Sequence, residues 1–157
     1  MLKKKSRAFT LIEVLLTMAL IGIVSSVATI SLSQLQNNSY SSSLIDALIS
    51  DIKTQQHFAM LQKKTSEESN FYGAYFKDDG YVLFEGVTFD PEKNTNYAVK
   101  FPKNIKITDI DLYQNLIVFE SFSGELYNFD PEKNSVTISE NTQISFSKLG
   151  VITLNNL

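Results

Sequence analysis

Glu13 is the residue whose position most clearly predicts chemistry, because it is the only charged side chain between Ala8 and Ile45. It lies near the start of an apolar run that extends from Phe9 to about Leu32. A carboxylate in an apolar helix costs roughly 2.5–3.5 kcal/mol at the centre of a bilayer and less near its surface, so such a residue is expected to have a function. The chemistry open to it is protonation or pairing with a positive charge. The pattern therefore indicates Glu13 as a candidate site of electrostatic pairing.

The chain lacks the residue combinations that most enzymes and metal sites use. It contains no cysteine, one histidine (His57) and no glycine-rich phosphate loop, so the usual nucleophile–base pairs and zinc sites cannot be assembled. The neighbouring acids, Asp78 with Asp79 and Asp109 with Asp111, are typical of turns and solvated strand faces, and nothing selects one pair for glycoside hydrolysis. We predict no enzymatic activity, no catalytic residue, no metal and no cofactor, and we interpret His57 as a partly exposed helix residue.

The apolar run from Phe9 to Leu32 is long enough to cross a membrane. Its roughly 24 residues would extend about 36 Å as a helix, against a hydrocarbon core of roughly 30 Å. Four basic residues precede it and none follows for many residues, which predicts a cytoplasmic N-terminus and an external remainder. A secretory signal peptide cleaved after residues 26–28 (Ser-Val-Ala) is an alternative, but its apolar stretch would be unusually long. A plain membrane anchor is the third interpretation.

The N-terminal segment resembles the type IV prepilin superfamily, which comprises pilins, type II secretion pseudopilins and competence pseudopilins. The leader carries Lys3, Lys4, Lys5 and Arg7, and the segment Phe9-Thr10-Leu11-Ile12-Glu13 follows in the register of the family. The resemblance is strong over about residues 3–35 and much looser beyond. One position departs from the pattern: Ala8 stands where the family usually has glycine before the cleaved bond. Because alanine is the smallest replacement, we expect cleavage to occur.

This resemblance implies processing and assembly. Prepilin peptidase is expected to cut between Ala8 and Phe9, Phe9 to be N-methylated, and Glu13 to pair with the new amine and direct assembly. The implied function is a structural subunit, a minor pilin or pseudopilin of a type IV pilus, type II secretion or competence filament. Implied partners are other pilin subunits, the peptidase, an assembly platform membrane protein and membrane lipid. The expected location is a single-pass cell-membrane protein with an external head, which then enters an extracytoplasmic filament.

A second helical segment and an all-β region follow the apolar run. From Phe9 to about Lys64 there is no proline and one glycine, which predicts one long helix with a weak point at the Asn- and Ser-rich residues 37–43. Apolar residues then recur at helical spacing, which predicts packing against a sheet: Leu44, Ile45, Leu48, Ile49, Ile52, Ala59 and Met60. We therefore divide the chain into a leader (1–8), a transmembrane and filament-core helix (9–35), an amphipathic helix (36–64) and a β-rich head (65–157).

The head has the alternating pattern of short strands. The expected strands are Phe71–Phe76, Tyr81–Glu85, Tyr97–Phe101, Leu116–Phe119, Glu125–Phe129, Val136–Ser139, Ile144–Phe146 and Val151–Leu154. Together with the helix they predict an α+β fold in which a long N-terminal helix packs its amphipathic half against antiparallel sheets. The layout, with helix Leu44–Lys64 followed by Tyr72–Phe76 and Tyr81–Phe84, resembles the H-class minor pseudopilins and FimT-like minor pilins.

The sequence Phe-Asp-Pro-Glu-Lys-Asn occurs twice, at 89–94 and 129–134. Asp accepts hydrogen bonds from amides two residues on, and Pro suits the second position of a turn, so both copies predict hairpin loops between strands. A paired acidic site for Ca²⁺ is the alternative, although the spacing matches no EF-hand.

The alternative function is that of a membrane-anchored or secreted surface binding module, including one that binds DNA. The balance of acidic and basic residues bears on this alternative. Without residues 1–8 the chain has ten basic and 17 acidic residues, which argues against phosphate-backbone binding. Lys100, Lys103 and Lys106 form the local basic cluster of the head. We interpret them as a solvated strand edge that discourages strand addition, and we do not expect nucleic acid as a partner.

Overall fold

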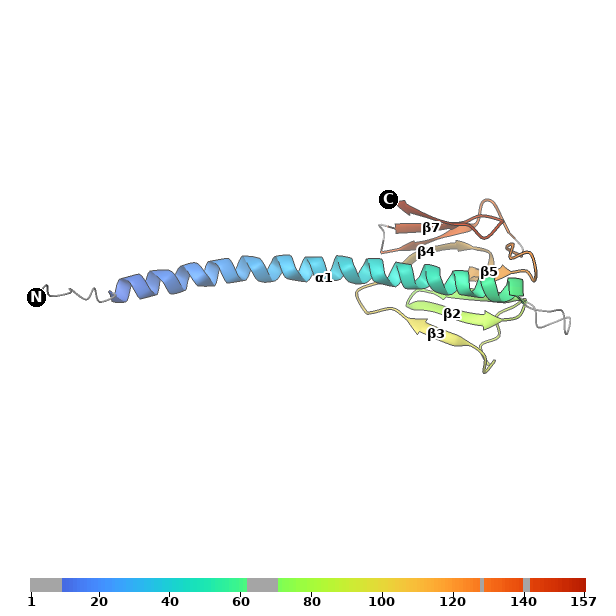
Figure 1. The fold of residues 1–157 in the computed structure, drawn as a ribbon, viewed down its shortest axis with the longest axis horizontal. Helices are drawn as coiled ribbons and strands as arrows, with labels where there is room; N and C mark the ends of the chain where they lie inside the picture. The colour runs from blue at the N-terminus through green and yellow to red at the C-terminus, as the bar shows by residue number, and fades with distance from the viewer. Residues whose placement is uncertain (1–9, 62–70, 128, 140–141) are drawn as a thin grey trace, which may run out of the picture. The chain divides into compact units, whose positions relative to one another are not determined.

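The computed structural model describes residues 10–61, 71–127, 129–139 and 142–157, and the side chains of residues 27–40 are not among the described ones. The chain divides after Ser42 into an N-terminal and a C-terminal unit. Helix α1 (Leu11–Leu61) provides the described part of the first unit and the helical part of the second (Figure 1). The prediction of one long helix is confirmed. Helix is assigned throughout residues 37–43, where the sequence predicted a weak point, because Asn and Ser cost only tenths of a kcal/mol each in a helix.

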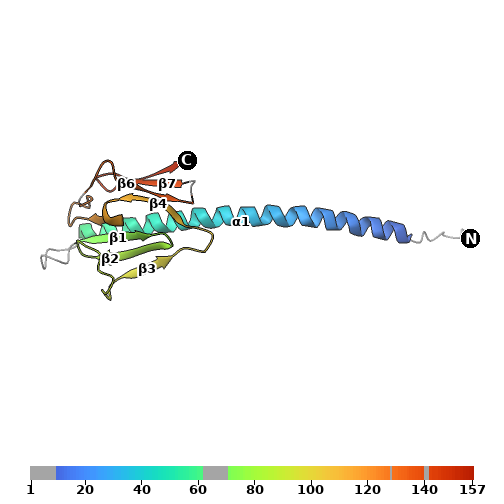
Figure 2. The ribbon, with the colours of Figure 1, turned by 180° about the vertical axis from the view of Figure 1, so that it is seen from behind.

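The C-terminal unit contains two four-stranded antiparallel sheets. The first has the order β3-β2-β1-β5 and the second the order β4-β6-β7-β8. Figures 1 and 2 show the two sheets from opposite sides, with the C-terminal part of α1 lying along them. The α+β fold class with antiparallel sheets is confirmed. The strands are β1 (Tyr72–Lys77), β2 (Gly80–Glu85), β3 (Tyr97–Lys100), β4 (Ile107–Leu112), β5 (Leu116–Phe119), β6 (Asn134–Ile138), β7 (Thr142–Phe146) and β8 (Ile152–Asn156).

One predicted strand is not formed, and one strand was missed. Glu125–Phe129 is not a strand, because its described pairing is limited to an isolated bridge between Leu126 and Phe119. Strand β4 was missed because its pairing with β6 shifts register between Ile107 and Asp109, and this irregularity breaks the period-two pattern.

The two Phe-Asp-Pro-Glu-Lys-Asn segments form the same kind of turn, but only the first one connects two paired strands. In both, the Asp side chain accepts a hydrogen bond from the amide two residues on, at 3.0 Å from Glu92 to Asp90 and 2.9 Å from Glu132 to Asp130. The first copy joins the paired strands β2 and β3, so its hairpin is confirmed. The second copy leads into β6, whose neighbours are β4 and β7, so that hairpin prediction was wrong.

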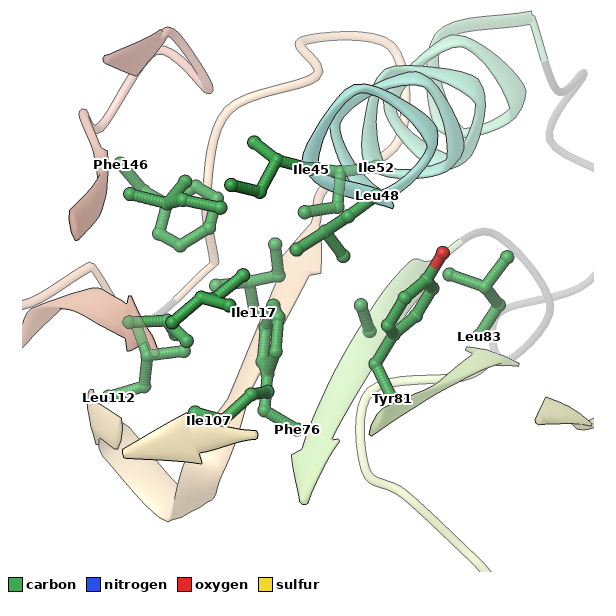
Figure 3. Close-up of a cluster of buried hydrophobic side chains, with 14 of the residues drawn as sticks. Ile45, Leu48, Ile52, Phe76, Tyr81, Leu83, Ile107, Leu112, Ile117 and Phe146 are labelled. Carbon is green, nitrogen blue, oxygen red and sulfur yellow. The ribbon is translucent and has the colours of Figure 1, made fainter. Parts of the chain in front are cut away.

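The core of the C-terminal unit joins α1 to both sheets. Figure 3 shows Ile45, Leu48 and Ile52 of the helix pointing toward side chains of the strands, including Phe76 and Ile117. Leu48 and Ile52 are fully buried. Burying a side chain of this size contributes roughly 1.5–3 kcal/mol, so this packing is a principal source of stability.

The apolar face of α1 that the sequence predicted is confirmed except at Met60. The prediction also omitted one buried residue, Gln55. The buried positions are 45, 48, 52, 55 and 59, which recur at steps of three and four residues. Met60, predicted on this face, is 48 % exposed because it follows Ala59 by 100° around the helix. Gln55 is 8 % exposed and occupies a position at which the sequence pattern has no apolar residue.

Polar contacts fix the end of α1 to two loops. The Gln56 side-chain amide donates to the carbonyl oxygens of Gly124, at 2.9 Å, and Leu149, at 3.2 Å. The Phe122 amide donates to the Ala59 carbonyl oxygen at 3.2 Å, which satisfies one of the acceptors that a helix end leaves open. The loops after β5 and β7 are thereby held against the last turns of the helix. Lysines near the C-terminal end of a helix interact favourably with its dipole, and the two that the sequence places there, Lys63 and Lys64, lie outside the described residues.

Inside the core, the Tyr81 hydroxyl group donates a 2.7 Å hydrogen bond to the Asp51 carboxylate of α1. Burial raises the pKa of Tyr81 above its ordinary value, and the hydrogen bond and charge of Asp51 raise it further. Since the folded-state pKa exceeds the unfolded one, this stability is fully present below about pH 10 and falls as the pH rises beyond it.

We predict that Tyr81→Phe lowers the free energy of unfolding by roughly 1.5–3 kcal/mol at neutral pH, because a hydrogen bond to a charged group is lost. The variant should also lose less stability than the wild type between pH 9 and about pH 11, since phenylalanine cannot ionise. Denaturant titrations at several pH values measure both effects. Tyr113→Phe, at a position 50 % exposed, is the control and should follow the wild type. If Tyr81→Phe and the wild type lost the same stability between pH 9 and about pH 11, the assignment of this pH dependence to Tyr81 would be contradicted.

Candidate functional site at the start of the helix

Glu13 lies in the first turn of α1, which begins at Leu11. The backbone amides of Glu13 and Val14 donate to the Thr10 carbonyl oxygen at 3.0 and 3.3 Å. Thr10, followed three residues later by Glu13, has the sequence pattern of a capping box at a helix N-terminus. The partial positive charge of that end also stabilises a carboxylate by about 0.3–1 kcal/mol. The exposed side chain of Glu13 therefore lies at the positive end of the helix dipole.

The predicted processing residues, Ala8 and Phe9, lie outside the described residues.

The first turns of α1 expose apolar side chains in every direction. Successive residues of a helix point 100° apart, so the exposed residues between 11 and 24 cover the whole circumference. Each is at least 41 % exposed: Leu11, Ile12, Val14, Leu15, Leu16, Met18, Leu20, Ile21, Ile23 and Val24. A helix that is apolar on all sides requires a surrounding membrane or other helices. Among the residues that the structure describes, no helical stretch meets the combined requirement of length and apolar character for crossing a membrane.

The other residues considered for chemistry lie apart from this segment in the chain. His57 is exposed on α1, Asp78 and Asp79 form the turn between β1 and β2, and Asp109 and Asp111 lie on β4. Within the described residues, no group of three His, Cys, Asp or Glu side chains is arranged to hold a metal ion.

The basic cluster lies at the end of an edge strand and beyond it. Lys100 ends β3, which forms one edge of the first sheet. Lys103 and Lys106 follow in the connection to β4, and all three side chains are exposed. A charged residue at an exposed edge is one way in which proteins discourage unwanted strand pairing, in agreement with the sequence-based interpretation.

Comparison with known proteins identifies the N-terminal segment. Residues 3–29 match the family described as Prokaryotic N-terminal methylation motif. No curated protein and no solved structure matches the chain. The motif is the class III prepilin signal and supports placement in the type IV pilin and pseudopilin superfamily. Glu13 and the expected cleavage site before Phe9 both fall within the matched range.

Proposed function

We propose that this chain, with its class III prepilin signal, is a structural filament subunit: a minor pilin or pseudopilin of a type IV pilus, type II secretion or competence filament. The match of residues 3–29 to the methylation motif carries this proposal. The motif is typical of prepilin peptidase substrates that are anchored in the membrane and assemble with other pilin subunits. The helix-then-sheet layout favours the H-class pseudopilins and FimT-like minor pilins as the nearest subtype.

The exposed apolar residues of α1 support the proposal that the surroundings of this helix change during assembly. Before assembly, lipid would surround residues 9–35 as a single-pass anchor, with the N-terminus in the cytoplasm and the head outside. In a filament, helices of neighbouring subunits would cover the same side chains. A helix with one apolar face could bury that face against its own head, whereas this segment exposes apolar side chains on all sides.

Processing would supply the charge that Glu13 needs. Cleavage between Ala8 and Phe9 removes the basic leader and leaves an amine four residues before the Glu13 carboxylate. Pairing with this amine, or with that of a neighbouring subunit, offsets the cost of a carboxylate in apolar surroundings. The assembly platform protein would be the further membrane partner during this step.

Disulfide crosslinking in cells tests the filament role, because the chain contains no cysteine of its own. We expect the double variant Leu16→Cys/Ile23→Cys to form oxidant-dependent crosslinks to partner subunits that carry cysteines at the corresponding positions. The crosslinks should vanish when the assembly platform protein is deleted, while the amount of membrane-inserted protein stays unchanged. Crosslinking that is independent of the platform protein would instead favour a membrane-anchored binding module.

A further inference from the structure

A groove in the C-terminal unit lies between α1 and the first sheet and encloses about 320 Å³. Aromatic rings and hydrogen-bond acceptors line it together: Phe58, Tyr72 and Tyr97 with Asp51, Gln55 and Glu85. No lysine, arginine or histidine is among its lining residues in the described part of the chain. The groove therefore combines negative charge with flat apolar surfaces.

Gln55 gives the clearest sign that the groove accepts a ligand. Its side chain is 8 % exposed, and its Oε1 atom is buried without a hydrogen-bond partner among the described residues. A buried acceptor without a donor destabilises the fold, so its presence on a groove requires an explanation. The last side-chain bond of glutamine rotates easily, which allows a ligand in the groove to satisfy this oxygen.

The two carboxylates lie on different elements. Asp51 is on α1 and accepts the hydrogen bond from Tyr81, which fixes its position but leaves it further acceptor capacity. Glu85 ends β2, and the nearby Lys93 Nζ donates at 2.8 Å to the Glu85 main-chain oxygen. In the described residues this lysine forms no hydrogen bond to the Glu85 carboxylate, and Glu85 is partly buried.

The aromatic side chains provide the flat surfaces. The rings of Phe58 and Tyr72 are 5.8 Å apart and tilted by 48°, so helix and sheet contribute to one aromatic surface. Tyr97, on the edge strand β3, is 66 % exposed. Rings of this kind attract a cation that lies over their faces.

We propose that this groove binds an arginine side chain presented by another protein. A guanidinium group is planar, stacks on aromatic rings and carries five donors, which suits a site with two carboxylates and an unpartnered amide oxygen. The only arginine of this chain is Arg7, which the proposed cleavage before Phe9 would remove, so the proposal commits to a different protein as the partner. The chemistry of the groove does not depend on the filament role, so either proposal can fail without the other.

The test uses the full chain in non-ionic detergent, labelled with 3-fluorotyrosine and observed by ¹⁹F NMR. N-acetyl-arginine methylamide is titrated in, with the citrulline analogue as the uncharged ligand of nearly equal shape. The resonances of Tyr72 and Tyr97 should shift saturably with the arginine compound and not with the citrulline compound. Those of Tyr113 and Tyr127, which do not line the groove, serve as internal references.

Two variants and a matched control complete the experiment. Glu85→Gln should weaken binding about fivefold or more, whereas Glu125→Gln, at a glutamate outside the groove that is also partly buried, should leave it unchanged. Gln55→Leu should weaken binding and raise the melting temperature, because it removes the unpartnered oxygen. Absence of saturable shifts, equal shifts with citrulline, or unchanged affinity in Glu85→Gln would overturn the proposal. Tighter binding of the N-acetyl-lysine analogue would overturn the assignment to arginine.

Discussion

Replacement of Ile52 by aspartate is expected to lower the free energy of unfolding of the C-terminal unit by roughly 3–5 kcal/mol. Ile52 is fully buried and packs in the cluster that joins α1 to both sheets. The substitution removes apolar packing and places a carboxylate without a described cationic partner in the core. Such a loss approaches the whole stability of a typical domain, so the variant should be largely unfolded at physiological temperature.

Two neighbouring positions provide controls for this experiment. Ile49→Asp should cost less than Ile52→Asp because Ile49 is only partly buried. Lys53→Asp, at an exposed position on the same turn, should change stability by about 0.5 kcal/mol or less. Tyrosine fluorescence during denaturant titration follows the C-terminal unit selectively, since six of the seven tyrosines lie in it. Equal stability of the three variants would mean that this helical face does not pack against the sheets.

Replacement of Glu13 by valine is expected to reduce incorporation into filaments about tenfold or more, with normal membrane insertion and cleavage. Loss of one buried charge pair costs a few kcal/mol, which is enough for this effect. The Leu16→Cys/Ile23→Cys background provides the measurement, as the ratio of crosslinked to membrane-inserted subunit. Wild-type crosslinking of Glu13→Val would contradict the role of the carboxylate in assembly.

Glu13→Gln separates charge from hydrogen bonding. Glutamine keeps the size and polarity of glutamate but cannot neutralise an amine. We expect an intermediate crosslinking level, since an amide oxygen still accepts a hydrogen bond. A level equal to that of Glu13→Val would show that the charge supplies the whole effect.

The helix and the N-terminal methylation motif were predictable because their signals are local. The absence of proline and the spacing of apolar residues specify α1 and most of its buried face. Glu13 and its register relative to Phe9 are contained in five consecutive residues. Gln55 was missed because a polar side chain at a buried position has no hydrophobic signal. Its position between Ile52 and Ala59, three residues after the first and four before the second, nevertheless fits the buried face of the helix.

The arrangement of the strands was less predictable because it depends on pairing between distant segments. The division into two sheets places β5 beside β1 and β6 beside β4, and no turn sequence specifies this choice. The segment Glu125–Phe129 has strand-like alternation but only one described bridge. The groove was unpredictable for the same reason, since Gln55 and Glu85 line one groove only after α1 packs against the first sheet.

The most direct test of the filament-subunit account is N-terminal mass spectrometry of the protein extracted from membranes of cells that contain prepilin peptidase. The account predicts a mature chain that begins at Phe9 and carries one methyl group on its new amine. A chain beginning at Thr29 would identify a secretory signal peptide and contradict the account. An uncleaved chain beginning at Met1 would equally contradict it, since Glu13 would then lack the amine on which its proposed role depends.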